Sequence, residues 1–169
     1  AEESRAFMKQ SGHNRKIIVI ASPNVRQNFR VQLFDERKLE QTGGIWNIDS
    51  CVGNQLLSEV NPLNLMGHSR ERIIQQIRTI IKKSYAFMGY GEFANFIDRH
   101  ISVSSDSGLS PEESKLRRLK NIKHLFNKRL VIIDEVHNMR LTDTNNNKRA
   151  AILLNEVAYK SDDTRLLVL

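Results

Sequence analysis

Cysteine is almost absent from the sequence, and so are long apolar stretches. The single cysteine, Cys51, has no partner for a disulfide within the chain, so cysteine usage does not indicate the redox compartment. No apolar run approaches the roughly 20 residues that cross a membrane, and residues 1–9 contain no signal-peptide core. We therefore expect an intracellular protein with no membrane partner, in the cytoplasm or, if it is viral, associated with the virion.

Positive charge is in excess. Lys and Arg number 26 and Asp and Glu 19 among 169 residues, which gives a formal net charge of +7 at pH 7. A hydrophobic fraction of 40% is enough for one domain with a core. A basic chain favours polyanionic partners, because phosphates release counterions when they are bound. A basic surface maintained for solubility explains the same composition.

Apolar runs alternate with amphipathic helical patterns along the chain. The runs typical of buried strands are residues 16–21, 84–90, 129–133 and 164–169. Helical patterns cover residues 1–12, 70–83, 148–159 and the stretch that follows Ser110. This alternation predicts an α/β fold with a mostly parallel sheet. We expect one domain over residues 1–169, with residues 102–113 as an exposed loop.

The apolar faces of two of these helices follow from helical spacing. In the helix at residues 1–12, Ala6, Phe7 and Met8 are expected to face inward. The expected buried residues of the helix at 148–159 are Ala151, Ile152, Leu154, Val157 and Ala158.

Two adjacent carboxylates end the apolar run at residues 129–133. Asp134 and Glu135 follow it directly, and His137 comes two places later. Open α/β sheets bind ligands at the carboxyl ends of their strands. Neighbouring carboxylates repel each other there unless a cation lies beside them. A divalent metal with a nucleotide supplies that charge, so Asp134 is a candidate Mg²⁺ ligand and Glu135 a candidate base for an attacking water.

A second strand–helix junction follows residues 16–21. Ser22 suits a helix N-cap and Pro23 suits the first helical turn. The free amides at such a helix start form a site for phosphate, and Arg26 and Arg30, one turn apart, would reinforce it. An ordinary strand–helix junction explains the same residues.

Three segments resemble motifs of superfamily 2 helicases and nucleic-acid translocases. Ile-Asp-Glu-Val-His-Asn-Met-Arg, at 133–140, resembles motif II, the D-E-x-H box. The segment that begins Ser22-Pro23-Asn24 resembles motif Ia, and Tyr-Gly-Glu-Phe-Ala-Asn, at 90–95, resembles the motif Ib region of remodeller-like enzymes. The chain looks most like the helicase/ATPase group of large nucleocytoplasmic DNA viruses, which includes poxvirus-type early transcription factor and nucleoside-triphosphatase proteins.

The resemblance implies a partial RecA-like, P-loop NTPase fold with three layers, and a role for each motif residue. Asp134 would bind Mg²⁺, Glu135 would position and deprotonate the water that attacks the γ-phosphate, and His137 would link the nucleotide state to the nucleic-acid site. The residues that would contact DNA or RNA are Ser22, Pro23, Asn24, Arg26, Tyr90 and Glu92. Tyr90 and Phe93 are expected to be core residues first and contacts second. Mg²⁺ and ATP would be cofactors of the intact parent, and none is expected bound to this chain.

Two family elements are missing from the sequence. No G-x-x-x-x-G-K-[ST] phosphate loop is present, and the chain ends where motif III would begin, after residues 164–169. We therefore expect a truncated domain that lacks the phosphate-loop strand and does not hydrolyse ATP alone. The strand at 166–169 would then present an apolar open edge, so we expect a homodimer or a covered edge.

Two other functions fit parts of the pattern. The basic helices at 70–83 and after Ser110 would suit a non-catalytic nucleic-acid or protein-binding module. A metal-dependent hydrolase would use Asp134, Glu135 and His137 without a nucleotide, although the sequence offers no convincing further ligands.

Overall fold

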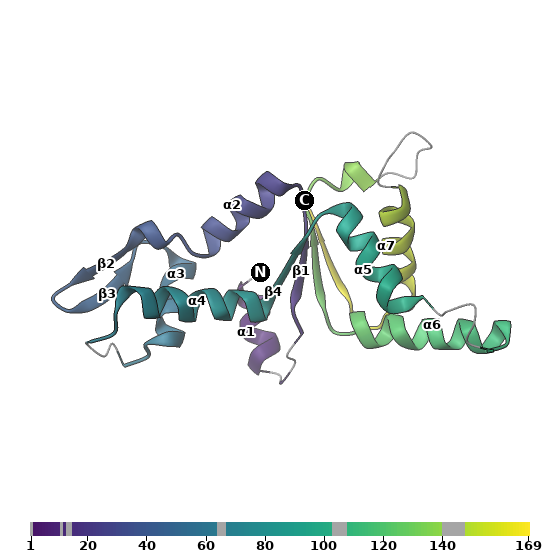
Figure 1. Ribbon diagram of the computed structural model, residues 1–169, viewed down its shortest axis with the longest axis horizontal. Coiled ribbons are helices and arrows are strands. Elements are labelled where there is room, and N and C mark those ends of the chain that lie inside the picture. Colours follow the sequence, from purple (N-terminus) through teal and green to yellow (C-terminus); the bar gives the residue numbers. More distant parts are fainter. Residues whose placement is uncertain (1, 11, 13–14, 64–66, 103–107, 140–147) are drawn as a thin grey trace.

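A parallel four-stranded sheet forms the centre of the computed structural model, which describes residues 2–10, 12, 15–63, 67–102, 108–139 and 148–169 (Figure 1). The strands, in spatial order, are β4 (Tyr85–Met88), β1 (Ile17–Ile20), β5 (Leu130–Ile133) and β6 (Arg165–Val168). All three neighbouring pairs are parallel. The predicted α/β fold with a mostly parallel sheet is thus confirmed, and this sheet is compatible with a partial RecA-like three-layer fold.

Helices cover both faces of the sheet. One face packs against α5 (Tyr90–Ile101), α6 (Pro111–Phe126) and α7 (Lys148–Lys160). The other face packs against α1 (Glu2–Gln10) and α2 (Pro23–Leu33). Successive strand residues point to opposite faces, so a strand covered on both sides must be apolar throughout. That requirement explains why every residue of β1 and β5 is buried.

A second hydrophobic cluster lies beside the sheet, at the left-hand end of Figure 1. It contains the antiparallel hairpin of β2 (Leu39–Thr42) and β3 (Ile45–Ile48), with α3 (Cys51–Val60) and α4 (Arg70–Ser84). Gly43 and Gly44 have φ of 58° and 83°, as a tight hairpin turn requires. Trp46 is buried in this cluster, and its Nε1–H donates to the carbonyl of His68 at 2.9 Å.

The exposed faces of two helices differ from the prediction. In α1, Met8 is buried as predicted, but Phe7 is 57% exposed and Glu2 and Arg5 are buried. In α7, Ala151 and Val157 are buried as predicted, but Ile152 is 51% exposed, while Ala150 and Leu153 lie in the core. Ala158 is also exposed. The apolar stripe of α7 is therefore rotated toward α5 and α6, which the sequence of α7 alone does not reveal.

Only part of the predicted loop at 102–113 lies within the described residues. Residues 103–107 lie outside the described residues, and residues 111–113 form the first turn of α6 instead of loop. Ser110 caps that helix: its hydroxyl accepts from the Glu113 amide, and the Glu113 carboxylate accepts from the Ser110 amide.

The outer edge of β6 is exposed, as predicted. Leu166, Leu167, Val168 and Leu169 are 40%, 42%, 48% and 63% exposed. Within the described residues, β6 pairs with β5 alone. The same residues include no helix with the length and apolar character needed to cross a bilayer.

An ion pair joins α6 to α7. The Nε of Arg118 donates to a Glu156 carboxylate oxygen at 2.7 Å, and the Lys160 ammonium lies 2.9 Å from the same oxygen. The hydrogen bond from Arg118, aided by Lys160, lowers the pKa of Glu156 to about 2 despite its partial burial. The ionised form is thus favoured in the folded state, so this stability is present above the ordinary pKa of 4.5 and is lost as the pH falls toward about 2.

We expect Glu156→Gln to lower the free energy of unfolding at pH 7 by about 1–2 kcal/mol, since solvent screens part of the pair. Urea unfolding from pH 7 to pH 2 should show the wild type losing this advantage below pH 4.5. Glu40→Gln, on exposed β2, is the control and should change stability by less than about 0.5 kcal/mol. Parallel pH profiles of the wild type and Glu156→Gln would contradict the expected linkage.

Candidate functional site

The acidic pair lies at the carboxyl edge of the sheet. Asp134 and Glu135 follow β5 directly. The Asp134 amide donates to the carbonyl of Ile20, the last residue of β1, at 3.0 Å. On the other side, the Leu169 amide donates to the carbonyl of Ile133 at 2.9 Å. The pair therefore lies where β1, β5 and β6 end, which is the edge that the sequence predicted.

The backbone turns sharply at the second acid. Glu135 has a φ of 48°, in the left-handed region that side chains larger than glycine rarely adopt. A short 3-10 turn, Val136–Met139, begins immediately afterwards and holds His137 exposed. Lys128 and Asp163 adopt similar φ values of 57° and 56°, so the conformation by itself does not identify a site.

Tyr90 connects this turn to the hydrophobic core. Its ring packs against the core cluster of α5, α6 and α7, and its hydroxyl donates to the Asp134 carbonyl at 2.7 Å. The predicted nucleic-acid contact is therefore held between the core and the backbone of the acidic turn. From this position Tyr90 holds the backbone carbonyl of Asp134.

An ion pair links the junction between β1 and α2 to the junction between β4 and α5. Arg26 of α2 donates through Nη1 to a Glu92 carboxylate oxygen of α5 at 2.8 Å. The same oxygen accepts from the Gly89 amide at 2.6 Å. The Arg26 side chain is 17% exposed, and its buried Nε has no hydrogen-bond partner in the described structure. Arg26 and Glu92, both predicted to contact nucleic acid, are thus brought together as partners of each other.

The start of α2 retains free donors. Ser22 is extended and Pro23 occupies the first helical turn, as predicted, but the Ser22 side chain makes no capping hydrogen bond. The amides of Asn24 and Val25 have no hydrogen-bond acceptor among the described residues. Such amides, with the positive end of the helix dipole, can bind an anion.

The acidic turn fits a magnesium ion better than it fits a complete nucleotide. The Asp134 carboxylate makes no hydrogen bond or ion pair with any described residue, so it is available as a ligand. No three His, Cys, Asp or Glu side chains gather as a metal site in the described part of the chain. Magnesium commonly uses one or two carboxylates together with water and substrate phosphates. The sequence contains no loop of the G-x-x-x-x-G-K-[ST] type to hold the triphosphate.

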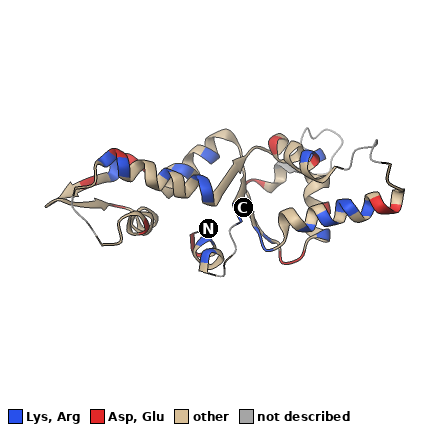
Figure 2. Cartoon of the chain, turned by 60° about the horizontal axis from the view of Figure 1, so that its bottom comes forward, with Lys and Arg blue, Asp and Glu red and all other residues tan. Residues whose placement is uncertain are grey.

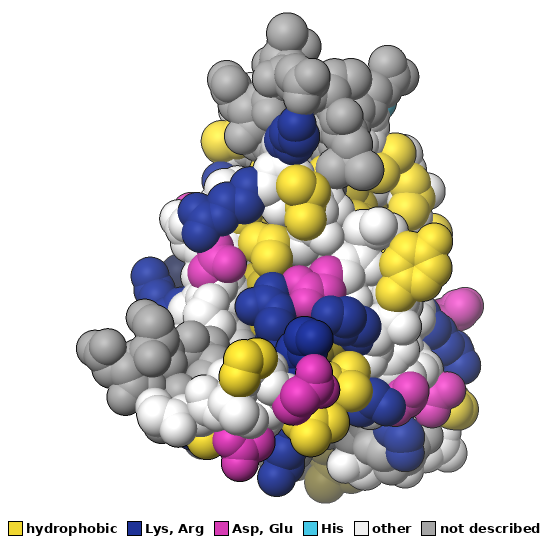
Figure 3. Space-filling view, turned by 90° about the vertical axis from the view of Figure 1, so that its right-hand side faces the viewer, with side chains coloured by type: hydrophobic (Ala, Val, Ile, Leu, Met, Phe, Trp, Pro, Cys, Tyr) yellow, Lys and Arg dark blue, Asp and Glu magenta, His cyan; other side chains and the backbone are white. Residues whose placement is uncertain are grey.

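Three of the five lysines and arginines of α6 pair with neighbouring acids, whereas Arg117 and Lys120 are exposed and form no ion pair with a described residue. Arg118 pairs with Glu156, Lys123 lies 2.9 Å from Asp162, and Lys115 lies 3.4 Å from Glu112. Figure 2 shows acidic residues at the outer end of this helix, and the space-filling view shows basic and acidic side chains interspersed at this end of the molecule (Figure 3). The helix therefore presents a mixed ionic surface, which gives less support to a binding module based on α6.

The chain matches no protein-family model, no curated protein and no solved structure. Its functional assignment therefore depends on the fold and on the residues at the carboxyl edge of the sheet.

Proposed function

We propose that this chain forms the inner part of the first RecA-like domain of an ATP-dependent helicase or translocase that acts on DNA or RNA. The proposal depends mainly on one observation: Asp134 and Glu135 end a buried parallel strand between the ends of β1 and β6. Two acids at that position suit a metal and the terminal phosphate of a nucleotide. An intracellular location, in the cytoplasm or a virion, accompanies this proposal.

Each acid has a distinct role in the proposed reaction. Asp134, with its carboxylate available and its backbone held by Tyr90, binds Mg²⁺ that arrives with the nucleotide. Glu135 accepts a proton from the water that attacks the γ-phosphate. His137, exposed in the turn that follows, communicates the nucleotide state to the nucleic acid.

The nucleic-acid path is proposed to cross the neighbouring junctions. The order β4-β1-β5 places the junction after each strand at the same edge of the sheet. Phosphates of the nucleic acid would meet the free amides at the start of α2, next to Ser22, Pro23 and Asn24. The Arg26–Glu92 pair fixes the α2 and α5 junctions relative to each other, so that movement at one is transmitted to the other.

The test compares ATP hydrolysis by two polypeptides in Mg²⁺, with and without single-stranded DNA or RNA. The 169-residue chain alone should give no turnover, because its sequence lacks the lysine and amides of a phosphate loop. The polypeptide encoded by the entire reading frame should hydrolyse ATP and respond to nucleic acid.

Two results would count against the proposal. One is ATP hydrolysis by the 169-residue chain that Glu135→Gln abolishes, since the lysine and amides of a phosphate loop would then be unnecessary. The other is salt-sensitive nucleic-acid binding by the product of the entire reading frame with no effect of nucleotide, which supports the alternative of a non-catalytic binding module.

Self-association through β6 is a further part of the proposal. The exposed edge of β6 has unpaired backbone groups and apolar side chains, which favour pairing with a second copy. We expect the 169-residue chain to dimerise in sedimentation velocity experiments and Leu167→Lys to be monomeric. Leu116→Lys, at a 66% exposed position on α6, is the matched control and should still dimerise. A wild-type chain that stays monomeric at high concentration would rule out this edge as an interface.

A further inference from the structure

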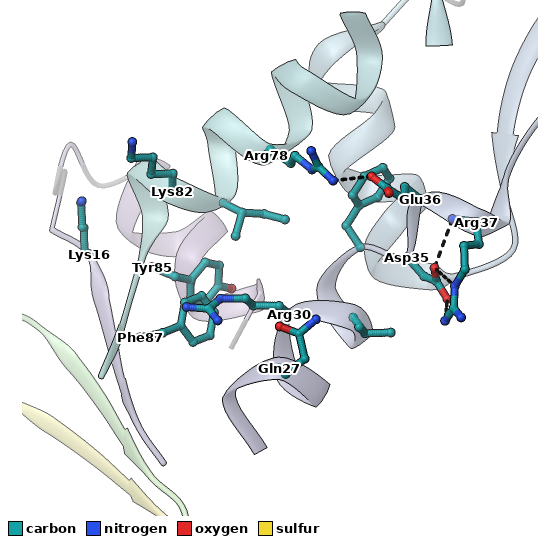
Figure 4. Close-up of a pocket in the computed structure, with 13 residues that line it drawn as sticks. Lys16, Gln27, Arg30, Asp35, Glu36, Arg37, Arg78, Lys82, Tyr85 and Phe87 are labelled. Carbon is teal, nitrogen blue, oxygen red and sulfur yellow. Dashed lines mark hydrogen bonds and ion pairs between the residues drawn. The ribbon is translucent and has the colours of Figure 1, made fainter. Parts of the chain in front are cut away.

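A cavity of about 710 Å³ lies away from the acidic turn (Figure 4). Its walls come from the second half of α2, the last turns of α4 and the starts of β1 and β4. Lys16 immediately precedes β1, and Tyr85 begins β4, so both lie at the amino-terminal edge of the sheet. Asp134 follows β5 and lies at the carboxyl edge. The cavity is therefore separate from the proposed nucleotide site, and its volume suits a small ligand.

Three cations in this cavity have no anionic partner. The two acids that line it are already paired, Asp35 with Arg37 at 2.9 Å and Glu36 with Arg78. Among the described residues, Lys16, Arg30 and Lys82 form no ion pair. Figure 4 shows Lys16 and Lys82 on the same side of the cavity, and Arg30 beside Phe87. Three unpaired cations around one hollow give a site whose charge is complementary to a polyanion.

Aromatic rings orient one of these cations. The Arg30 guanidinium lies over the Phe87 ring, 4.6 Å from its centroid. Phe87 in turn stacks on Tyr85, with 5.8 Å between the ring centroids, and contacts Phe29 edge-on at 5.8 Å. A guanidinium over an aromatic ring can still donate from its N–H groups to two phosphate oxygens.

We propose that this cavity is a second anion site, which binds the polyphosphate group of a small ligand through Lys16, Arg30 and Lys82. The ligand is an inorganic polyphosphate or a nucleoside polyphosphate, since both carry the same linked phosphates. A small ligand fits better than a nucleic-acid strand, because the three cations line one hollow that is bounded on one side by the Asp35–Arg37 and Glu36–Arg78 pairs. Binding here requires no metal, because the protein itself supplies the positive charge.

Titration calorimetry on the 169-residue chain, in low salt with EDTA, tests the site with tripolyphosphate, ATP and adenosine as probes. Tripolyphosphate and ATP should bind and adenosine should not. Tighter binding of ATP than of tripolyphosphate identifies a nucleotide site, and equal binding identifies an inorganic polyphosphate site. Arg30→Gln and Lys82→Gln should each weaken binding roughly tenfold, as expected for loss of a charged hydrogen bond.

The control is Lys83→Gln, which makes the same change of charge one residue away, on the side of α4 that faces a different hollow. It should weaken binding less than twofold, and Asp134→Asn should leave it unchanged, which keeps this test independent of the proposed ATPase function. The side chains of Arg30, Lys82 and Lys83 are exposed, so their variants should unfold at the same urea concentration as the wild type.

The proposal is overturned by any of three results. The first is no binding of tripolyphosphate or ATP at millimolar concentration. The second is an equal loss of tripolyphosphate affinity in Lys82→Gln and Lys83→Gln, which means that binding depends only on the overall charge of the chain. The third is a single-stranded 20-mer that binds more tightly than tripolyphosphate through Lys82, because the surface would then be a nucleic-acid site.

Discussion

Arg5→Met is expected to lower the free energy of unfolding by about 3–5 kcal/mol, the typical cost of removing one partner of a buried ion pair. Arg5 is 5% exposed in α1, and its Nε donates to Glu2 at 2.6 Å. Its terminal nitrogens donate to Glu59 of α3. Burial by itself would lower the pKa of Arg5, but the hydrogen bonds to Glu59 and Glu2 outweigh it and raise the pKa above its ordinary value. Methionine in its place leaves the buried Glu2 carboxylate without its cation.

The effect should extend to the sheet, because Glu2 also accepts a hydrogen bond from the Tyr85 hydroxyl at the start of β4. Burial and this hydrogen bond raise the pKa of Tyr85, so its hydroxyl remains a donor at neutral pH. The network thus attaches α1 to both α3 and β4. Loss of Arg5 should loosen α1 from both, which hydrogen exchange of the α1 amides can detect.

Urea unfolding at pH 7 checks this prediction against a matched variant. Lys9→Met removes another cation of α1 that pairs with Glu59, but the Lys9 side chain is 66% exposed, so the cost should be less than about 1 kcal/mol. Adding Glu2→Gln to Arg5→Met should recover part of the loss, since the buried charge is then gone. Equal losses in Arg5→Met and Lys9→Met would show that burial does not determine the energetics of this network.

The same network explains why the prediction for α1 was wrong at Phe7. Helical spacing places apolar residues inward, and Phe7 was assigned accordingly, but Arg5 lies inward because acids from Glu2 and distant Glu59 compensate its charge. A partner 54 residues away is not visible in the sequence of a helix. The buried strands were predictable because an entirely apolar run has few alternatives in a chain with charged residues on either side.

Helix α3 was not anticipated, although Val52, Leu56, Leu57 and Val60 have the spacing of one helical face. Glycine weakens helices, so Gly53 in the first turn of α3 needs a reason in the packing. In the structure, a Cβ at Gly53 would lie 2.8 Å from the Ile48 side chain. The glycine therefore allows the start of α3 to approach β3 closely, a requirement of tertiary packing.

The candidate site shows the same division between local and long-range features. The position of Asp134 and Glu135 at the end of β5 was predictable, because it needs only the strand to be recognised. The Arg26–Glu92 pair was not, because it depends on β1 and β4 being neighbours in the sheet. Arg26 was selected as a cation beside a phosphate site at a helix start, and Glu92 was selected from resemblance, each as a separate contact to nucleic acid. Their pairing emerges only once the strand order is known.

Substitutions at Glu135 are expected to separate backbone strain from chemistry. Its φ of 48° disfavours any side chain, so Glu135→Gly should raise the free energy of unfolding by about 0.5–1 kcal/mol. Glu135→Gln keeps the backbone strain and removes only the charge of the carboxylate. If Glu135 is the general base, both variants of the product of the entire reading frame should lose roughly 10²–10⁴-fold in the rate of ATP hydrolysis.

Lys128→Gly provides the matched control, since Lys128 has a φ of 57° but lies before β5, away from the acidic turn. Lys128→Gly should raise the free energy of unfolding by a similar amount and leave the rate of ATP hydrolysis at the wild-type value. Urea unfolding and steady-state ATP hydrolysis on the same preparations make the comparison. Hydrolysis that survives Glu135→Gln would exclude Glu135 as the base. Lys128→Gly and Glu135→Gly could instead lower the rate of ATP hydrolysis equally. The rate would then depend on the rigidity of the turns at both ends of β5.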